Sequence, residues 1–535
     1  MTKVDAALAR MAELRGQRYL IVSGDSHAGP VPEVHYRPYC PEKYLPQFDE
    51  FCEQSRRAAK PTRDRIMEGR AGDKPDPTLR ELGLEAFARN IECEGHHDPG
   101  AHLRHMDESG IAAEVVFAGG QNLEELPFMG KGWNAGPAGI PAELRSLAGS
   151  IWNRWIADYV SADPDRLTGV LQMPVWDIDA AITEVHWGAE RGLRLVNLPA
   201  PRPDFPVYTD RIYEPLWGAC AEAGMVLQTH SGGGEDGLGI GSPRGMLLHI
   251  SENHWLSNRG LAQLLFGGVF HRHPNLKFVM TESRVAFAPD VIRHLDGIYD
   301  NAMSPERRGG GLLPAAPFIL GSVDGDGDID DDPANLDALP RRPSEYWEDN
   351  CVVCGSFMAP YEVAYRHEVG LTNLIWGSDY PHCEGTWPYT REALRNTFCT
   401  VPEDEARLIL GETAATSSAS TARSWRRSRP ASARRPRSSP PRWRPTSSRR
   451  GGAAPSGCPA PTSSPAPTSS KDSHVDRRDH DRVHERARRV LGRAVLRGPP
   501  APHRGPGEAV HAGDAQPHGR GDADPRRPAR GRHGP

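Results

Sequence analysis

Eight short runs of apolar and β-branched residues recur along the first 415 residues, and stretches with helical spacing separate them. Such runs are typical of strands buried on both faces, which occur in parallel sheets covered by helices. Eight strand–helix pairs favour a closed barrel over an open sheet, so we predict a (β/α)8 TIM barrel. The runs are Leu20 to His27, Ala113 to Ala118, Leu167 to Pro174, Leu193 to Pro199, Met225 to Ser231, Leu276 to Ser283, Asn350 to Gly355 and Leu374 to His382.

The segment between the third and fourth runs shows the helical pattern most clearly. Asp177 to Arg191 has apolar residues at helical intervals, with Asp177 in the N-cap position and Gly192 as a stop. A helix there would carry the chain back to the start of the next parallel strand. Similar helices are expected at Arg145 to Val160, Tyr213 to Ala223, Asn258 to Phe270, Pro289 to Tyr299, Pro360 to Gly370 and Glu403 to Leu410.

Four long insertions follow the carboxyl ends of predicted strands, at about 28–100, 119–142, 232–257 and 300–344. In a barrel this is the face that carries the active site, so we expect these loops to build walls or a lid over a pocket. The acidic run Asp324 to Asp332 lacks the glycine and the final glutamate of a calcium-binding loop, since Ile329 stands in the glycine position. It is interpreted as a solvated loop.

Composition and charge exclude several classes of protein. A formal net charge of -6 with 38% hydrophobic residues gives no reason to expect nucleic acid or a membrane as partner. Met1 to Arg18 is expected to form a short polar helix or arm rather than a secretory signal. Among nine cysteines, Cys351 and Cys354 form a C-x-x-C within a strand-like run, which favours buried reduced thiols over a redox or zinc pair. These features predict a cytoplasmic protein with a small-molecule partner.

The amino-acid composition of the chain changes near residue 415. From Thr416 onward Arg, Pro, Ser, Ala and Gly dominate, and Ile, Phe, Tyr, Met and Asn do not occur. Such a segment cannot bury enough apolar surface to offset chain entropy, so residues 416–535 are predicted to be a disordered low-complexity tail. A nucleic-acid arm is the less favoured interpretation, because only Trp425 and Trp443 offer rings for stacking. The predicted organisation is an N-terminal helix or arm at 1–18, a barrel at 19–415 and this tail.

Ligating side chains stand at the ends of three predicted strands. The first ends in Asp25 and His27, whose i, i+2 spacing puts both on one face of a strand; the fifth ends in His230 and the eighth in Asp379. Taken alone, Asp25 and His27 would be interpreted as a hydrogen-bonded pair. His230 alone would be interpreted as a core histidine whose hydrogen bonds are made within the protein. Together they indicate a metal site, in which two imidazoles and two carboxylates leave room for water or substrate.

Several motifs in order make the chain resemble the amidohydrolase-related superfamily, in the branch of aminocarboxymuconate semialdehyde decarboxylase and the hydroxybenzoate decarboxylases. The likeness extends from Tyr19 to Ala415. It rests on the D-x-H at Asp25, and on the stretches Leu103 to Ile111, Ala162 to Val170, His273 to Lys277 and Trp376 to His382.

The resemblance implies that Asp25, His27 and His230 bind a metal, and that Asp379 is both ligand and acid/base. Asp25 stands where the family usually has His or Glu, and Glu282 stands where many relatives have a catalytic His. Glu282 is therefore a candidate general acid or orienting group. The fourth strand carries no lysine to bridge two ions, which is consistent with one metal.

Other polar residues near these ends are weaker candidates. His382, three residues after Asp379, is expected to contact substrate, to orient that carboxylate or to stabilise its loop. An anionic substrate would need a cationic partner on the active face. Solvent-facing roles are nevertheless favoured for the side chains that could supply one, which are Arg284, His254, His96 and His97.

Two enzyme functions fit these residues, and a third class stays open. The first is hydrolysis of a small carboxylate-bearing or aromatic substrate by metal-activated water, with Asp379 taking a proton. The alternative is a non-oxidative carboxy-lyase (decarboxylase) on an aromatic or enol acid. A catalytically degenerate binding barrel is the third. One divalent ion is expected, zinc rather than manganese, because a mixed imidazole and carboxylate set suits borderline ions. The resemblance alone implies a homodimer.

We predict that the sequence after Thr416 is the product of a reading-frame change in a GC-rich gene. Codons can be chosen for Thr416 to Ser432 that, read two bases later, give LFGFDRAKLEAIAARI, an aromatic turn followed by an amphipathic helix suited to close a barrel. Sequencing the gene near codon 416 checks this. The prediction fails if no single-base insertion or deletion there restores an open frame with that apolar ending. Removal of the tail at about residue 415 should leave metal content and activity unchanged.

Overall fold

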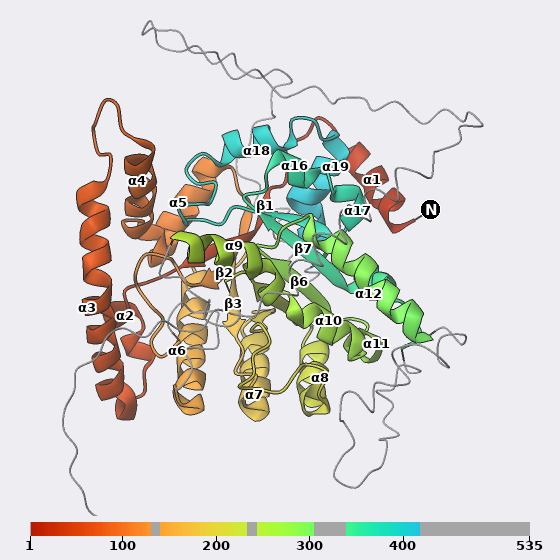
Figure 1. Cartoon of the computed structure of the whole chain (residues 1–535), viewed down its shortest axis with the longest axis horizontal. Coiled ribbons are helices and arrows are strands. Elements are labelled where there is room, and N and C mark those ends of the chain that lie inside the picture. Colours follow the sequence, from red (N-terminus) through yellow and green to blue (C-terminus); the bar gives the residue numbers. More distant parts are fainter. Residues whose placement is uncertain (1, 130–139, 233–242, 304–338, 418–535) are drawn as a thin grey trace, which may run out of the picture. The chain divides into compact units, whose positions relative to one another are not determined.

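Eight parallel strands form one sheet in chain order, as the apolar runs predicted. The carboxyl end of the last strand returns to the first, where Ser26 and Tyr380 form a parallel bridge, so the sheet closes into a nearly complete barrel. The (β/α)8 prediction is therefore confirmed (Figure 1). The strands are β1 (Val22–Ala28), β2 (Ala113–Ala118), β3 (Leu167–Gln172), β4 (Leu195–Asn197), β5 (Val226–His230), β6 (Lys277–Thr281), β7 (Cys351–Ser356) and β8 (Leu374–Gly377).

The computed structural model describes residues 2–129, 140–232, 243–303 and 339–417. All of these belong to one compact unit, Met1–Pro441. The acidic run Asp324 to Asp332 and nearly all of the predicted tail lie outside the described residues. Within them, no helix is both long enough and apolar enough to cross a membrane.

Strand side chains alternate between two hydrophobic clusters. On β2, Val115 and Phe117 point into the barrel, whereas Val116 and Ala118 join the cluster between sheet and helices. Both sets are buried, because helices cover the outside of the sheet and opposing strands fill its inside. This double burial explains why the strands are continuous apolar runs in the sequence.

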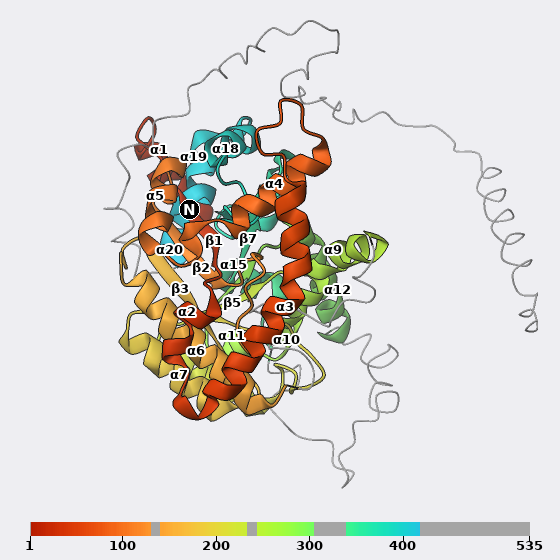
Figure 2. The same ribbon diagram turned by 90° about the vertical axis from the view of Figure 1, so that its left-hand side faces the viewer.

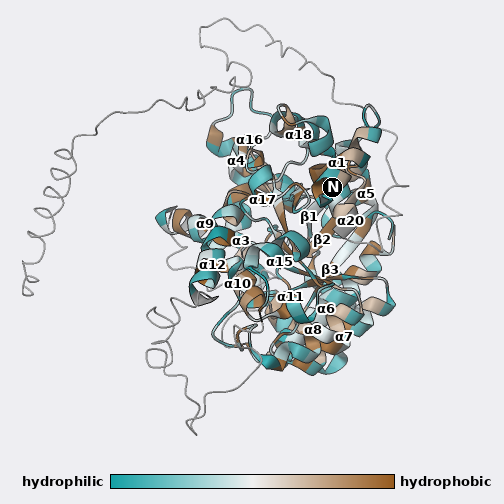
Figure 3. Ribbon diagram, turned by 90° about the vertical axis from the view of Figure 1, so that its right-hand side faces the viewer, coloured by the Kyte–Doolittle hydropathy of each residue, from teal (hydrophilic) through white to brown (hydrophobic). Residues whose placement is uncertain are grey.

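Helices return the chain between strands, close to where the spacing predicted them. Asp177 caps α7 by accepting a hydrogen bond from the Ala180 backbone N–H at 3.0 Å. In Figure 3 the outer helices carry both hydrophilic and hydrophobic residues, as expected when one face lies on a sheet. They include α6 (Ala142–Val160), α7 (Ile178–Glu190), α8 (Glu214–Glu222), α10 (Arg259–Phe266), α12 (Phe287–Met303), α15 (Pro343–Asn350) and α18 (Thr390–Phe398).

Three predicted helices are divided in the structure. The stretch Asn258 to Phe270 breaks into α10 and α11 (Val269–Arg272), because Gly268 adopts a φ of 66° that ends the first helix. Pro360 to Gly370 forms two single turns, α16 (Pro360–Val363) and α17 (Arg366–Val369). Glu403 to Leu410 begins as α19 (Glu403–Arg407).

After α19 the chain continues as a π-helical turn, Leu408–Glu412, and a final helical turn, α20 (Thr413–Ser417). A Cβ on Gly411 would lie 2.2 Å from the Leu20 carbonyl oxygen, so only glycine allows this turn to pack so closely under the start of β1. Ala414 and Ala415, the last residues before the change in composition, are buried in the cluster inside the barrel.

The insertion after β1 is mainly helical, although its sequence gave no strong helical signal. A long helix, α3 (Leu45–Gly69), packs beside α4 (Leu79–Ile91), and the two lie side by side in Figure 2. Thr78 and Glu81 form a capping box at the start of α4. The insertion also contains α2 (Pro32–His35), three short turns (Arg37–Tyr39, Glu42–Tyr44 and Glu94–His96) and α5 (Pro99–Ser109), while α9 (Pro243–Ser257) belongs to the third insertion.

The N-terminal residues form a short helix, α1 (Lys3–Glu13), as expected. It packs against α19, with Ala7 and Met11 buried, and Arg15 forms an ion pair with Asp404. In this structure the segment contacts the barrel rather than extending from it.

Candidate metal centre

Side chains from the ends of β1 and β5 meet at the carboxyl end of the barrel. Asp25 and His27 on β1 and His230 on β5 each offer one ligand atom, and these atoms all lie within 4.8 Å of one another. Asp379 follows β8 and reaches the same place, with its Oδ1 3.4 Å from His27 Nε2. All four side chains are buried. The structure therefore groups Asp25, His27 and His230, and it places Asp379 beside His27.

The spacing of these atoms suits a single ion. His230 Nε2 is 3.2 Å and His27 Nε2 is 3.3 Å from the same oxygen of Asp25. Ligand atoms held about 2.1 Å from an ion at the centre of a tetrahedron are separated from one another by about 3.4 Å. Two imidazoles and two carboxylates are a donor type that suits a divalent cation, and the atoms of Asp25, His27 and His230 also have the spacing for one.

Each candidate ligand is held by a contact on its other atom, which leaves one atom for an ion. His230 Nδ1 donates to the Ser231 carbonyl at 2.7 Å, and His27 Nδ1 lies 3.3 Å from the Ala118 carbonyl. These contacts turn Nδ1 of each ring toward a carbonyl and Nε2 toward Asp25, on the side where an ion would bind. Asp25 is oriented in the same way, because its Oδ2 accepts a hydrogen bond from the Ser356 hydroxyl.

Asp379 has the arrangement expected of an additional ligand. It is fully buried, and neither carboxylate oxygen accepts a hydrogen bond from the residues that the structure describes. The His382 Nδ1 atom lies 2.8 Å from Asp379 Oδ1. A buried carboxylate with so few donors is unfavourable unless a proton or a cation occupies the space in front of it.

Backbone strain is concentrated at the same edge of the barrel. Asp379 has a φ of 55° and Glu282, just after β6, a φ of 54°. For residues with a Cβ this left-handed conformation costs about 1–3 kcal/mol and occurs mainly at functional sites. Both residues are the ones for which the family resemblance implied a catalytic role.

Charges within the metal centre set the protonation of Asp25 and His230. Burial opposes ionisation of Asp25, but attraction to His230 and His27 outweighs it and lowers the pKa of Asp25. For His230, burial is again the largest effect, yet the charge of Asp25 overcomes it and raises the pKa of His230 to about 9. Burial lowers the pKa of His27. Without a metal, one proton therefore serves as the counter-charge to Asp25.

A second group of carboxyls crowds beside this centre. Oxygens of Glu282, Asp379 and Glu384 lie within 4.8 Å of one another. Burial raises the pKa of Asp379 to about 7 against the attraction of His382. Burial and the charge of Asp379 raise the pKa of Glu282 well above its usual value. Three carboxyls this close cannot all ionise easily, so this side of the centre retains protons near neutrality.

His382 lies against the metal centre rather than in it. Its ring stacks on His27 with centroids 3.9 Å apart, and its Nε2 is 3.0 Å from the Gly119 carbonyl. Gln121 connects His382 to Glu384, one of the three crowded carboxyls. Its amide nitrogen is 3.2 Å from His382 Nδ1 and donates to Glu384 at 2.9 Å. Of the roles considered for His382, orientation of Asp379 is the one that these contacts favour.

The weaker candidates divide into buried and rim residues. His96 is buried, with Nε2 2.9 Å from the Asn90 side chain, so the solvent-facing role expected for it is wrong. His97 stacks on His35 with centroids 4.8 Å apart. The Arg284 guanidinium is half exposed and donates to the Tyr361 hydroxyl.

Two further predictions concern His254 and the cysteines. His254, on α9, packs against the rings of Trp255 and Phe287. Cys351 and Cys354 are buried free thiols, as predicted, and burial raises the pKa of both.

Sequence reasoning missed three residues that contact the centre. Ser356 ends β7, where a search for ligands at every strand end would have found it. Glu384 follows His382 by two residues, so proximity along the chain was an available signal. Gln121 adopts a φ of 48° in the loop after β2, and no sequence pattern marks that contact.

We predict that the metal-free protein binds a divalent ion more tightly as the pH rises toward about 9. His230 is protonated below that pH in the metal-free state, and an ion must displace this proton to reach Nε2. Between pH 7 and pH 9 the affinity should increase by up to about tenfold per pH unit, and it should level off above that range. Calorimetric titration in buffers of different ionisation enthalpy measures the released proton. A pH-independent affinity with no proton release would contradict the pairing of His230 with Asp25.

Comparison with known proteins identifies the family. A model of the amidohydrolase family matches residues 134–416, which is more than half of the chain. No curated protein is similar enough to this chain to count as a match.

Several solved structures are similar at low identity. 5-Carboxyvanillate decarboxylase from Sphingomonas paucimobilis is 18% identical, with a TM-score of 0.46 over 75% of this chain and 99% of that one. An amidohydrolase from Mycobacterium avium subsp. paratuberculosis is also 18% identical, with a TM-score of 0.49 and the same coverage. The manganese complex of 5-carboxyvanillate decarboxylase from Novosphingobium aromaticivorans is 14% identical, with a TM-score of 0.47 over 75% and 96% of the two chains. On the family match, this chain belongs to the amidohydrolase family of metal-dependent enzymes.

Proposed function

We propose that this enzyme is a non-oxidative carboxy-lyase, which removes carbon dioxide from a small aromatic or enol acid with the help of one divalent ion. The observation that carries the proposal is the protonated carboxyl group beside the metal centre. Glu282 lies beside Asp379 but outside the proposed donor set, and burial and the charge of Asp379 raise the pKa of Glu282 well above its usual value. Loss of carbon dioxide leaves electron density on carbon, which an acid in this position can protonate.

The ligands proposed for the ion are Asp25, His27, His230 and Asp379. The bound ion would supply a positive charge that holds the substrate's carboxylate or hydroxyl oxygen and withdraws electrons from it. Zinc is the ion expected from this donor set, and manganese is the competing one. The distances of 3.2 to 3.4 Å between donor atoms support this assignment.

The residues around the ion have separate roles in the proposed reaction. Asp379 binds the ion as a carboxylate, and His382, 2.8 Å from its Oδ1, orients it. Glu282, whose side chain is 18% exposed, lies outside the donor set and retains its proton, so it can supply the proton that passes to carbon. The cytoplasmic location and the homodimer expected from the sequence stay predictions.

Hydrolysis by metal-activated water is the second candidate, because the same four ligands would serve it. In that reaction Asp379 must begin ionised so that it can accept a proton from water. The short contact between His382 Nδ1 and Asp379 Oδ1 is the observation that favours this alternative, since a histidine at that distance stabilises the carboxylate. The two functions differ in the group that handles the proton, which is Glu282 as acid in the loss of carbon dioxide and Asp379 as base in hydrolysis.

We predict that His230→Ala and Asp379→Ala each lose most of the bound metal. Either change removes one donor from a set of four and leaves the other charges buried without compensation. Elemental analysis of the purified chains measures this, with wild type expected to hold about one divalent ion per chain. His273→Ala is the matched control, because this half-buried histidine pairs with Glu214 away from the centre. Full metal and full activity in both variants would show that the ligand assignment is wrong.

We predict that the loaded enzyme releases carbon dioxide from at least one member of a panel of hydroxybenzoic acids, the class that includes substrates named for the similar structures. Glu282→Gln should reduce the rate by a factor of about 10² to 10⁴, which is the usual contribution of a positioned acid, while the metal content stays that of wild type. Release of carbon dioxide and the proton uptake that accompanies it can be followed together. Turnover of an ester or amide panel with no carbon dioxide from any acid would instead support the hydrolase.

A further inference from the structure

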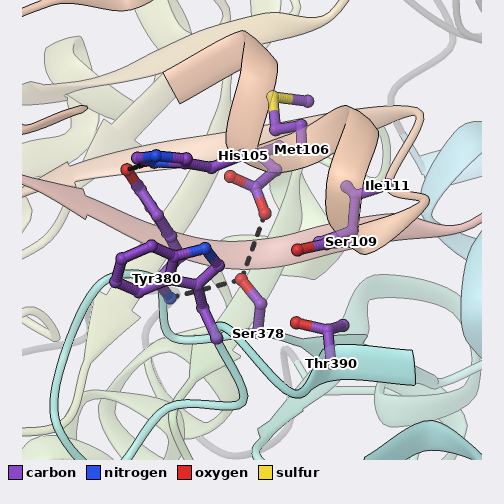
Figure 4. A pocket seen from close by; sticks show the side chains of 9 residues that line it. His105, Met106, Ser109, Ile111, Ser378, Tyr380 and Thr390 are labelled. Carbon is purple, nitrogen blue, oxygen red and sulfur yellow. Dashed lines mark hydrogen bonds between the residues drawn. The ribbon is translucent and has the colours of Figure 1, made fainter. Parts of the chain in front are cut away.

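A narrow space that is too small to hold a water molecule lies behind the metal centre, between α5, β2 and the loop after β8. Ser378 and Tyr380, on either side of Asp379, line it together with Glu114 of β2 and residues of α5 (Figure 4). Glu114 and Ser378 are almost completely buried. This buried carboxylate is not part of the metal donor set, and the proposed reaction does not use it.

The Ser378 hydroxyl is the junction of a hydrogen-bond network that reaches both candidate carboxylate ligands. Its oxygen accepts from the Tyr380 N–H at 3.2 Å and lies 3.1 Å from both Glu114 Oε1 and the Asp25 carbonyl. The Ser23 hydroxyl is 2.7 Å from that carbonyl and 3.0 Å from the Ser378 oxygen, and the Asp379 N–H donates to the same carbonyl at 3.0 Å. With the Ser23 hydrogen on its shorter contact, both lone pairs of the carbonyl are used, so the single hydrogen of Ser378 is directed to Glu114.

Both oxygens of Glu114 make hydrogen-bond contacts, one with Ser378 and one with His102. The Tyr159 hydroxyl donates its one hydrogen to the Gly95 carbonyl at 2.6 Å. His102 Nδ1, which is 2.9 Å from the same hydroxyl, must then be the donor in that contact. His102 Nε2 is 2.6 Å from Glu114 Oε2 and shares a second proton with it. One oxygen of Glu114 thus faces His102, and the other faces Ser378.

We propose that Glu114 is a positioning residue for the metal centre and acts through Ser378. The Ser378 backbone is held at both of its polar groups, because its N–H donates to Ser23 at 2.8 Å and its carbonyl accepts from Thr386 at 2.8 Å. Glu114 fixes the remaining group, the side chain. This anchor holds Asp379 in its left-handed conformation, with a φ of 55°, and aligns it with Asp25. The proposal rests on the ligand assignment made under the proposed function.

Glu114→Gln replaces one of the two carboxylate oxygens by an amide nitrogen with almost no change in the shape of the side chain. Glutamine has one carbonyl oxygen, so its amide group would face either His102 or Ser378 as donor against donor. Glu184 on α7 offers a matched control. It is a buried carboxylate whose two side-chain donors, Asn153 and Arg154, both bind Oε2, so glutamine can keep both contacts there.

The experiment measures the affinity of the full, metal-stripped chain for Mn²⁺ by equilibrium dialysis. Changes to residues that orient metal ligands cost about 10- to 100-fold in affinity, and we expect a loss of this size for Glu114→Gln. Glu184→Gln should stay within about twofold of wild type, although both variants lose a buried charge. The visible spectrum of the Co²⁺-loaded protein should also change only for Glu114→Gln, because it reports ligand geometry rather than stability. Wild-type affinity and an unchanged spectrum for Glu114→Gln would overturn the proposal.

Ser378→Ala extends the test to a variant that leaves the buried charge in place, and it serves alone if Glu114→Gln does not fold. It should weaken Mn²⁺ binding by a similar factor. The double variant should bind no more weakly than the worse single variant, because both changes remove one interaction. Additive losses, or wild-type affinity in Ser378→Ala, would overturn the proposal. If His230→Ala keeps its metal, the ligand assignment itself is wrong. If His230→Ala loses its metal while Glu114→Gln binds Mn²⁺ as tightly as wild type, only the role of Glu114 is contradicted.

Discussion

The burial of ionisable groups where β8 returns to β1 is the constraint on which the rest of the site depends. Moving a carboxylate out of water costs several kcal/mol unless an opposite charge lies close to it. Asp25 has such a partner in protonated His230 when no metal is bound. Asp379 has fewer donors, and neither of its oxygens accepts a hydrogen bond from a described residue. One divalent ion placed among these groups would satisfy both carboxylates at once, which explains why the chain can keep them in the barrel.

Closure of the barrel and assembly of the site are the same structural event. The bonds that join the two ends of the sheet run from Asp379 N to the Asp25 carbonyl and from His27 N to the Tyr380 carbonyl. A Cβ on Gly377 would lie 2.7 Å from Cβ of Asp25, so this close approach requires glycine. Three of the four candidate ligands are therefore held by the contacts that complete the fold. A distortion of the seam would move the metal ligands before it exposed the core.

The barrel and its donor set were predictable because their signals are local. Strand periodicity located all eight strands, and parallel strands necessarily bring residues at their carboxyl ends, such as Asp25 and His230, to one edge. Other features depend on contacts between distant segments. The long helix α3 is stabilised by packing on α4, and His96 is buried because Asn90 pairs with its ring. Neither contact leaves a pattern in the sequence.

The crowded carboxyls also bear on which reaction the site can favour. Glu282, Asp379 and Glu384 present oxygens within 4.8 Å of one another at the side of the centre that a substrate would approach. An acid substrate adds a further negative charge there, so it binds only where the ion and the protons of these carboxyls offset the repulsion.

Arg284 is poorly placed to help, because its guanidinium donates to Tyr361 and lies 3.4 Å from the Glu362 carboxylate. Loss of carbon dioxide removes the substrate's charge and consumes one proton. The repulsion is then relieved as the reaction proceeds, whereas hydrolysis of an ester or amide would generate a new carboxylate in the same place. On electrostatic grounds, the cluster of Glu282, Asp379 and Glu384 disfavours a reaction that produces an anion and favours one that consumes an anion.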